Sequence, residues 1–207
     1  MFKFITSWDD GDKMDLGLAA MLKQFNIPAI FFIPTTTKLS EDNIKMLAKN
    51  FTIGGHTVNH PEDLKQLCGK KLRYEVRANK KWLEGIIKKE IEWFCYPSGR
   101  YDQTTINAVK DAGFKYARTV LVMNTDQPQD DYRIATSIHV YPHRKEYCGR
   151  PWLEVAKELW EKAKSKDNGV FHLWGHSLEI SKFNLWNELE EFFEYIQKDK
   201  YLWEIPK

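Results

Sequence analysis

Residues 28–34 read PAIFFIP, a nearly all-apolar run bounded by prolines. A strand that has one solvated face alternates apolar and polar residues, whereas a strand covered on both faces is apolar throughout. This segment therefore predicts a doubly buried strand of a parallel sheet. Because parallel strands are joined by crossover connections, which are usually helical, the flanking sequence should alternate between strands and helices.

The flanking sequence alternates in this way about seven times. Strand-like segments lie at 2–8, 28–34, 51–55, 92–96, 115–119, 134–141 and 170–174. Helical patterns lie at 13–25, 40–50 with Ser40 as N-cap, 63–87 with a break at Gly69, 103–112, 152–164 and 185–198. The rhythm predicts an α/β fold with a parallel sheet. Periodicity alone does not choose between a closed barrel and an open doubly wound sheet.

Length and composition describe one globular domain, predicted to span residues 1–207. The 31 basic and 29 acidic residues leave a net charge of +2, which excludes a nucleic-acid partner recognised through bulk charge. No run of about 18 apolar residues occurs, so no membrane partner is expected. The amino end lacks the long apolar segment of a secretory signal, which predicts a cytoplasmic protein. Three cysteines without a C-x-x-C pair predict no disulfide framework.

Polar residues gather where the predicted strands end. In a parallel α/β fold all strand carboxyl ends lie on one face, and that face hosts active sites. We therefore expect these residues to converge in space. They are Asp9 and Asp10 after the first strand, His56 and His60 after the third, Pro97–Gly99 after the fourth, Arg118 at the end of the fifth and His176 after the seventh.

Two of these elements together are typical of a metal site. The side chains of Asp9 and Asp10 point in different directions, so one carboxylate can bind a cation while the other stays free as a base; an acidic turn is the plain alternative. His56 and His60 lie four residues apart, which puts both imidazoles on one side; two surface histidines are the alternative. Two histidines and one carboxylate leave coordination positions open, which is typical of a catalytic rather than a structural metal site.

The segment HLWGHSLE contributes two further histidines. His172 lies inside a strand, where we expect a core histidine held by a hydrogen bond. His176 lies at the strand end, where it can donate a proton to a leaving group, and Glu179 is a candidate to orient it; a loop or helix-capping residue is the alternative for His176. His139 lies near the end of the sixth strand, where it either touches substrate or is a core histidine.

These motifs resemble those of the polysaccharide deacetylases, carbohydrate esterase family four. SWDDG at 7–11 is similar to the family's T-F-D-D-G motif, and HTVNH at 56–60 resembles its H-[S/T]-x-x-H motif. FCYPSG at 94–99 resembles the third motif, and the strand ending in His176 resembles the fifth. The resemblance covers residues 3 to 180, and three ordered motifs make it more specific than any one of them.

The resemblance implies a distorted (β/α)7 barrel and a metal-dependent hydrolase that removes N- or O-acetyl groups from sugars, acting on carbon–nitrogen bonds other than peptide bonds. It implies an acetylated carbohydrate as substrate and zinc as the default metal, although nickel, cobalt and iron also suit such ligands. By position it implies Asp10, His56 and His60 as metal ligands, Asp9 as general base, His176 as general acid and the backbone N–H of Ser98 as an oxyanion donor.

The chain departs from the family pattern in two places. Cys95 stands where the third motif usually has an arginine that pairs with the base aspartate. Arg118, at the end of the next strand, is a candidate to replace that arginine; a plain surface salt bridge is the alternative. The fourth motif, with its Asp and Trp, has no clear counterpart between residues 120 and 165.

Two further functions fit the same residues. Proteins that resemble this family also act on small cyclic amides or formylated sugars, and the missing fourth motif permits that. A catalytically silent carbohydrate-binding module of the same fold is the second alternative, although such a site usually loses some of the residues that this chain keeps. The oligomeric state does not follow from the sequence.

Overall fold

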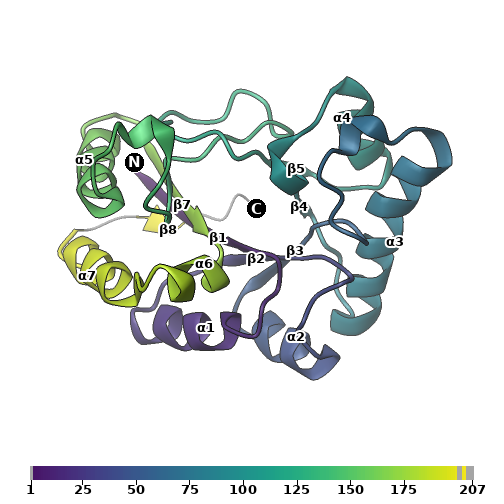
Figure 1. Ribbon diagram of the computed structural model, residues 1–207, viewed down its shortest axis with the longest axis horizontal. Helices are drawn as coiled ribbons and strands as arrows, with labels where there is room; N and C mark the ends of the chain where they lie inside the picture. Colours follow the sequence, from purple (N-terminus) through teal and green to yellow (C-terminus); the bar gives the residue numbers. More distant parts are fainter. Residues whose placement is uncertain (1, 200–201, 204–207) are drawn as a thin grey trace.

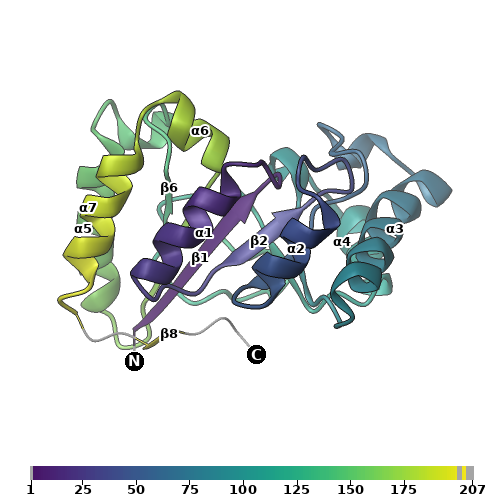
Figure 2. The same ribbon diagram turned by 90° about the horizontal axis from the view of Figure 1, so that it is seen from below.

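Parallel strands curl into one sheet with helices on its outside, as the computed structural model shows over residues 2–199 and 202–203 (Figures 1 and 2). The strands are β1 (Lys3–Asp9), β2 (Ile30–Ile33), β3 (Thr52–Gly55), β4 (Trp93–Cys95), β5 (Tyr116–Arg118), β6 (Ile138–His139), β7 (Val170–Gly175) and β8 (Leu202–Trp203). Their order is β5-β4-β3-β2-β1-β7-β6, with β8 also paired to β1. Every pairing between strands of the described residues is parallel, which confirms the predicted sheet.

The helices follow the predicted segments with small shifts at their ends. They are α1 (Asp15–Gln24), α2 (Glu41–Ala48), α3 (Gly69–Ile87), α4 (Gln103–Asp111), α5 (Trp152–Lys164), α6 (Ser177–Lys182) and α7 (Trp186–Ile196). Ser40 caps α2 through a reciprocal capping box with Asn43, as its position predicted. The expected break at Gly69 is confirmed, because a separate 3-10 turn at Leu64–Gln66 precedes α3. Helix α6 was not predicted, since six residues are too few for a clear periodicity.

The doubly buried strand is confirmed by its packing. All four residues of β2 are buried, and they alternate between two apolar clusters. Phe31 and Ile33 belong to the large cluster that also holds the helices' apolar faces. Ile30 and Phe32 belong to a smaller cluster with Trp93 and other residues of the sheet's inner face. No helix in the described part of the chain is long and apolar enough to cross a membrane.

The predicted sixth strand closes the sheet into a distorted barrel. Ile134 bridges in parallel to Arg118 at the end of β5, whereas β6 pairs with β7. Between these points the segment changes its hydrogen-bonding partner: the N–H of Thr119 donates to Ile134 O at 2.8 Å, and the N–H of Ser137 donates to His172 O at 2.9 Å. Because of this change, only two of the eight predicted residues form a regular strand. The fold is therefore a distorted (β/α)7 barrel rather than an open doubly wound sheet.

Asn79 on α3 joins the ends of two strands beside the expected site. Its side-chain N–H groups donate to Ile33 O at 3.0 Å and to Thr35 Oγ1 at 3.1 Å. Its Oδ1 accepts the backbone N–H of His56 at 2.9 Å. Asn79 is completely buried, so no water can replace these bonds. The helix thereby fixes the backbone at the point where β3 delivers its histidine.

We expect Asn79→Ala to lower the free energy of unfolding by about 2–4 kcal/mol, because it leaves a buried N–H and a buried carbonyl without partners. Urea unfolding of the variant and the wild type measures this difference. Asn107→Ala, on the exposed face of α4, is the matched control and should change stability by less than about 0.5 kcal/mol. Equal stability of the two variants would contradict the role assigned to Asn79.

Candidate active site

The residues singled out at the strand ends converge on one face of the barrel. A cavity of about 230 Å³ opens there, at the carboxyl ends of β1, β3, β4, β5 and β7. It is lined by Asp9, His56, His60, Ser98, Val120, Arg144, Trp174 and His176. Five of the six residues that the sequence placed in the reaction thus line this cavity. The sixth, Asp10, lies within 3.7 Å of three of them. Arg144 and Val120 were not singled out by sequence.

Asp10, His56 and His60 form a compact group. Nε2 of His56 and Nε2 of His60 each lie 3.4 Å from the same atom, Oδ1 of Asp10. His56 is almost completely buried, whereas His60 and Asp10 are partly exposed. One ligand atom from each residue lies within 4.8 Å of the others. The spacing of four residues does place both imidazoles on one side, as the sequence predicted.

The chemistry of this group fits a divalent cation. Nδ1 of His56 donates a hydrogen bond to Cys95 O at 2.8 Å, which leaves the Nε2 lone pair directed at Asp10. Oδ1 of Asp10 is buried and has no hydrogen-bond partner. A buried carboxylate oxygen without a donor is costly, and a cation between it and the two imidazoles satisfies it. The three side chains supply one oxygen and two nitrogen ligands.

The pKa shifts of Asp10, His60 and His56 bear on metal binding. Burial raises the pKa of Asp10, but the adjacent imidazole of His56 outweighs it and leaves the pKa well below its ordinary value. Burial and the neighbouring His56 lower the pKa of His60. Burial lowers the pKa of His56, while Cys95 and Asp10 raise it to a net value above the ordinary one. The carboxylate of Asp10 is therefore ionised, as a metal ligand has to be.

The loop between the two histidines is held from α3 by Glu75. Its Oε2 accepts the backbone N–H groups of Val58 at 3.0 Å and Asn59 at 2.9 Å. Its Oε1 accepts a side-chain N–H of Asn59 at 2.6 Å. Within the loop, the backbone N–H of His60 donates to Thr57 Oγ1 at 3.1 Å. Sequence reasoning did not single out Glu75 or Asn79 for this task, because their spacing from the loop carries no local signal.

Asp9 lies beside the group and is bound by Arg118. Both side chains are buried, and Nη2 of Arg118 donates to Oδ2 of Asp9. The same nitrogen lies 2.8 Å from Cys95 Sγ, and the guanidinium carbon lies 4.4 Å from the ring centroid of Trp174. Burial raises the pKa of Asp9, but the charge of Arg118 outweighs it and the net pKa is lowered. Arg118 is therefore a buried partner of Asp9, and the surface salt bridge is wrong.

The second carboxylate oxygen of Asp9, Oδ1, is available to accept a hydrogen bond or a proton. Oδ1 is buried and has no hydrogen-bond partner among the described residues. The nearby thiol of Cys95 lies 3.6 Å from Oδ2, on the side already bound by Arg118. Asp9 is thus an ionised carboxylate with one oxygen anchored and the other unengaged.

His176 faces both aspartates. Its Nε2 lies 4.0 Å from Oδ2 of Asp9 and 3.7 Å from Oδ2 of Asp10. Its Nδ1 donates to Oε2 of Glu179 at 2.6 Å, one turn further along α6. Burial lowers the pKa of His176, but Glu179 and the two aspartates raise it to a net value above the ordinary one. These three carboxylates therefore favour the imidazolium form of His176.

His139 is a second histidine that contacts Glu179. Its Nε2 lies 3.0 Å from the same Oε2 that His176 contacts, and its ring stacks on Trp174 with centroids 3.8 Å apart. Burial lowers the pKa of His139 to about 4, so the ring is neutral and donates to Glu179. Burial raises the pKa of Glu179, but its bonds to the two histidines lower it to about 2. Of the two alternatives for His139, its burial favours a supporting core histidine.

The structure also places two further histidines and Ser98. His172 is a buried core histidine, and its Nε2 lies 2.8 Å from Oγ of Ser7. His143 is exposed. Ser98 lines the cavity in a left-handed conformation with φ of 53°, and the next residue, Gly99, has φ of 64°. A Cβ atom on Gly99 would lie 2.1 Å from the side chain of Val120, so this turn requires glycine.

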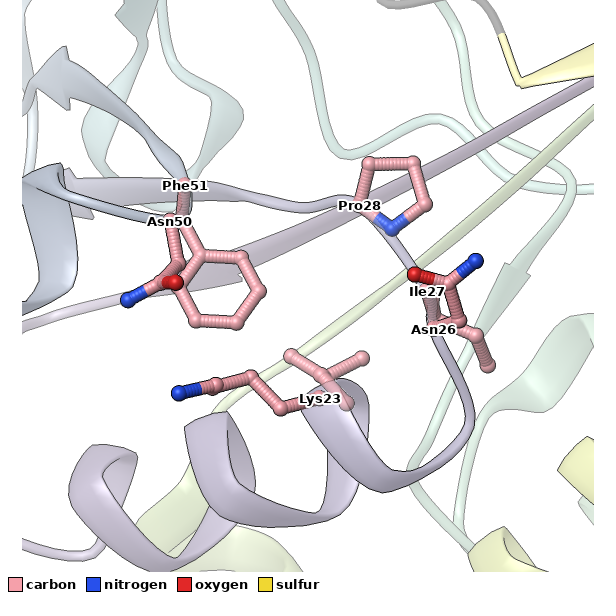
Figure 3. A pocket seen from close by; sticks show the side chains of 7 residues that line it. Lys23, Asn26, Ile27, Pro28, Asn50 and Phe51 are labelled. Carbon is pink, nitrogen blue, oxygen red and sulfur yellow. The ribbon is translucent and has the colours of Figure 1, made fainter.

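A second pocket lies at the opposite end of the barrel, where β2 and β3 begin. It measures about 380 Å³, and Figure 3 shows Lys23, Asn26, Pro28, Asn50 and Phe51 among the residues around it. None of the residues singled out by sequence lines this pocket. Volume alone therefore does not single out the candidate site, which is distinguished by the convergence of ionisable side chains.

Comparison with known proteins identifies a matching family and a curated relative. The sequence profile of the family described as polysaccharide deacetylase matches residues 3–117. YxkH of Bacillus subtilis (strain 168), named as a polysaccharide deacetylase, is 27% identical over 105 residues, which cover 48% of this chain and 37% of YxkH. The chain thus spans well under two thirds of this curated relative.

Two solved structures share the fold. Streptococcus pyogenes deacetylase PplD, solved in complex with acetate, is 22% identical with a TM-score of 0.57 and matches over 63% of this chain and 62% of PplD. BA3943 of Bacillus anthracis, described as a CE4 family pseudoenzyme, is 17% identical with a TM-score of 0.63 over 94% of this chain and 61% of BA3943. At these identities the likeness concerns the fold alone.

We expect Arg118→Leu to lower the free energy of unfolding by about 3–5 kcal/mol, because it leaves the buried carboxylate of Asp9 without its counter-charge. The double variant Asp9→Asn/Arg118→Leu should recover part of this loss. Urea unfolding of the wild type, the single variants Asp9→Asn and Arg118→Leu and the double variant forms a double-mutant cycle that measures the coupling. Arg133→Leu, which breaks the exposed pair with Asp130, is the control and should cost at most about 1 kcal/mol.

Proposed function

Because the chain belongs to the polysaccharide deacetylase family, whose profile matches residues 3–117, we propose that it is a metal-dependent hydrolase that removes N-acetyl or O-acetyl groups from an amino sugar or polysaccharide. One observation carries the proposal: Asp9 stays outside the cluster of Asp10, His56 and His60, with His176 facing it across 4.0 Å. A base, an acid and a three-ligand metal cluster therefore meet in one cavity, which is the equipment that hydrolysis of an amide needs.

In this proposal Asp10, His56 and His60 hold the cation. Zinc is the default, and nickel, cobalt or iron also suit two nitrogens and one oxygen. When bound, a divalent cation supplies Lewis acidity, which polarises a carbonyl and makes a nearby water more acidic. Three protein ligands leave room for water and substrate, which supports a catalytic rather than a structural cation.

Asp9 is proposed as the general base. Arg118 anchors one of its oxygens and keeps it ionised, so the unengaged Oδ1 can accept a proton from the attacking water. Because Arg118 is buried against Phe32 and Trp174, the carboxylate cannot rotate without breaking a buried ion pair. The base is therefore held in one orientation before the substrate arrives.

His176 is proposed as the general acid and Ser98 as an oxyanion donor. The carboxylate of Glu179 binds Nδ1 of His176, so the proton on Nε2 faces the cavity and the amine nitrogen that leaves. An amine departs only after protonation, since its anion is far too basic. A backbone N–H such as that of Ser98 can stabilise the negative charge that develops on the acyl oxygen, and loss of one such donor costs about 3 kcal/mol.

Substitution of the proposed ligands should abolish metal binding without unfolding the protein. We expect wild-type protein dialysed against excess zinc and then desalted to retain about one equivalent per chain, since three ligands converge on one point. Asp10→Asn and His60→Ala should retain far less by elemental analysis. His143→Ala removes an exposed histidine outside the cavity and should retain as much as the wild type. Equal metal content in all four proteins would refute the assignment.

Substitution of the proposed acid and base should remove turnover. We expect acetate release from an N-acetylglucosamine oligomer by the zinc-loaded protein to fall about 10²–10⁴-fold in Asp9→Asn and in His176→Ala, because each removes one proton transfer. Chelation of the metal should stop the release. Asp42→Asn, on the exposed face of α2, is the control and should keep wild-type activity. Full activity of Asp9→Asn would rule out the assigned base.

Two alternatives give different results in the same assay. An enzyme for small cyclic amides or formylated sugars would leave the acetylated oligomer intact and turn over one of those compounds. A silent carbohydrate-binding module would bind metal and sugar but release no product, and the relative BA3943 is itself described as a pseudoenzyme. The presence of Asp9, Asp10, both cluster histidines and His176 supports an active enzyme over a silent module.

A further inference from the structure

We propose that Arg144 forms an anion-binding subsite beside the reacting acyl group, so that the preferred substrate is an acylated sugar that carries a carboxylate or phosphate. The inference rests on the proposed function and names the substrate class of that same cavity. It comes from a charged side chain that sequence reasoning did not single out.

Arg144 reaches the cavity from the loop that follows β6. Its Nη2 donates to the backbone carbonyl of Val120 at 2.7 Å, and Val120 packs on the turn that holds Ser98. Its guanidinium carbon lies 5.4 Å from the ring centroid of Trp174. These contacts fix the guanidinium in the cavity wall rather than in bulk solvent.

The other charged groups of the cavity have counter-charges. Asp9 is paired with Arg118, and His176 is paired with Glu179. Asp10 lies between imidazoles in the proposed metal cluster. Arg144 alone among the cavity-lining cations forms no ion pair with a carboxylate within residues 2–199 and 202–203.

The guanidinium of Arg144 also has an unused donor. Its Nε is buried and has no hydrogen-bond partner among the described residues. Glu146, two residues further along the chain, does not pair with it in the described structure, because Oε2 of Glu146 is likewise buried without a hydrogen-bond partner. A guanidinium does not lose its proton at any relevant pH, so its charge cannot be removed by titration. A cation that lines the cavity without a paired carboxylate is a site where an anion from outside the chain can bind.

The geometry points to an anion on the substrate. A guanidinium binds a carboxylate or a phosphate through two parallel N–H···O bonds, which neutral hydroxyl groups cannot match. The cavity of about 230 Å³ is small, so a group that touches Arg144 lies close to the groups that act on the acyl carbon. The anion is therefore expected on the acylated ring itself or on a directly attached substituent.

The test compares matched substrates. Wild type and Arg144→Gln, both zinc-loaded, are assayed on N-acetylglucosamine and on the same sugar bearing a carboxylate ether or a phosphate ester. We expect the wild type to favour an anionic sugar, and the ratio of kcat/KM for anionic over neutral substrate to fall about 10- to 100-fold in Arg144→Gln, the effect of losing a charged hydrogen-bonded pair. The carboxylate and phosphate arms identify which anion the site prefers. Arg150→Gln, which breaks an exposed pair with Glu158, is the control and should leave the ratio unchanged.

Two outcomes would overturn the inference. If Arg144→Gln lowered kcat/KM equally for neutral and anionic sugars, Arg144 would act on the reaction rather than on substrate choice. If the wild type showed no preference between the sugars, the subsite would not exist.

Failure of the proposed function itself is distinguishable. If no sugar released acetate, calorimetric titration of the zinc-loaded protein with the deacylated anionic and neutral sugars would still test the subsite. Tighter binding of the anionic sugar by the wild type, lost in Arg144→Gln, would support it. Equal binding of both sugars by both proteins would overturn it.

Discussion

The buried contact between Asp9 and Arg118 depends on the curvature of the sheet. Their strands, β1 and β5, are four steps apart in the strand order, which in a flat sheet is a separation of about 19 Å. The two side chains meet because the sheet curls and both point to its inner face. Each buried charge would be costly without the other, so the ion pair and the curvature stabilise one another. The cavity and every group in it depend on that curvature.

The position of Arg118 is related to that of Cys95 by strand register. Cys95 on β4 and Arg118 on β5 are direct partners in the parallel pairing. A guanidinium from the neighbouring strand therefore reaches the space that an arginine at position 95 would occupy, and the small thiol leaves room for it at 2.8 Å. The departure from the family pattern at residue 95 is thus accompanied by a side chain one strand further along. A positive charge is therefore retained beside Asp9, although it comes from Arg118 rather than from an arginine at position 95.

The loops that carry the site are held in unusual backbone conformations. Asp10, Thr57, His60 and Ser98 all have positive φ values, between 49° and 78°, which non-glycine residues seldom adopt. Such conformations cost free energy and persist only where the surroundings impose them. Glu75 supplies part of that support, through its bonds to the loop between the histidines. The surrounding structure thereby orients side chains that would point in other directions if the loops had an unstrained backbone.

The sequence by itself determined the alternation of strands and helices, the doubly buried strand and the order of polar residues at the strand ends. These features are encoded in local spacing, and local spacing survives in any arrangement of the chain. Only the tertiary structure decided that the sheet closes, that Arg118 binds Asp9, that His139 supports Glu179 and that Arg144 enters the cavity without a counter-charge. Three of these four features are contacts between residues many positions apart in the sequence. Their formation depends on the curvature of the sheet and the register of its strands, which cannot be predicted from a local pattern of residues.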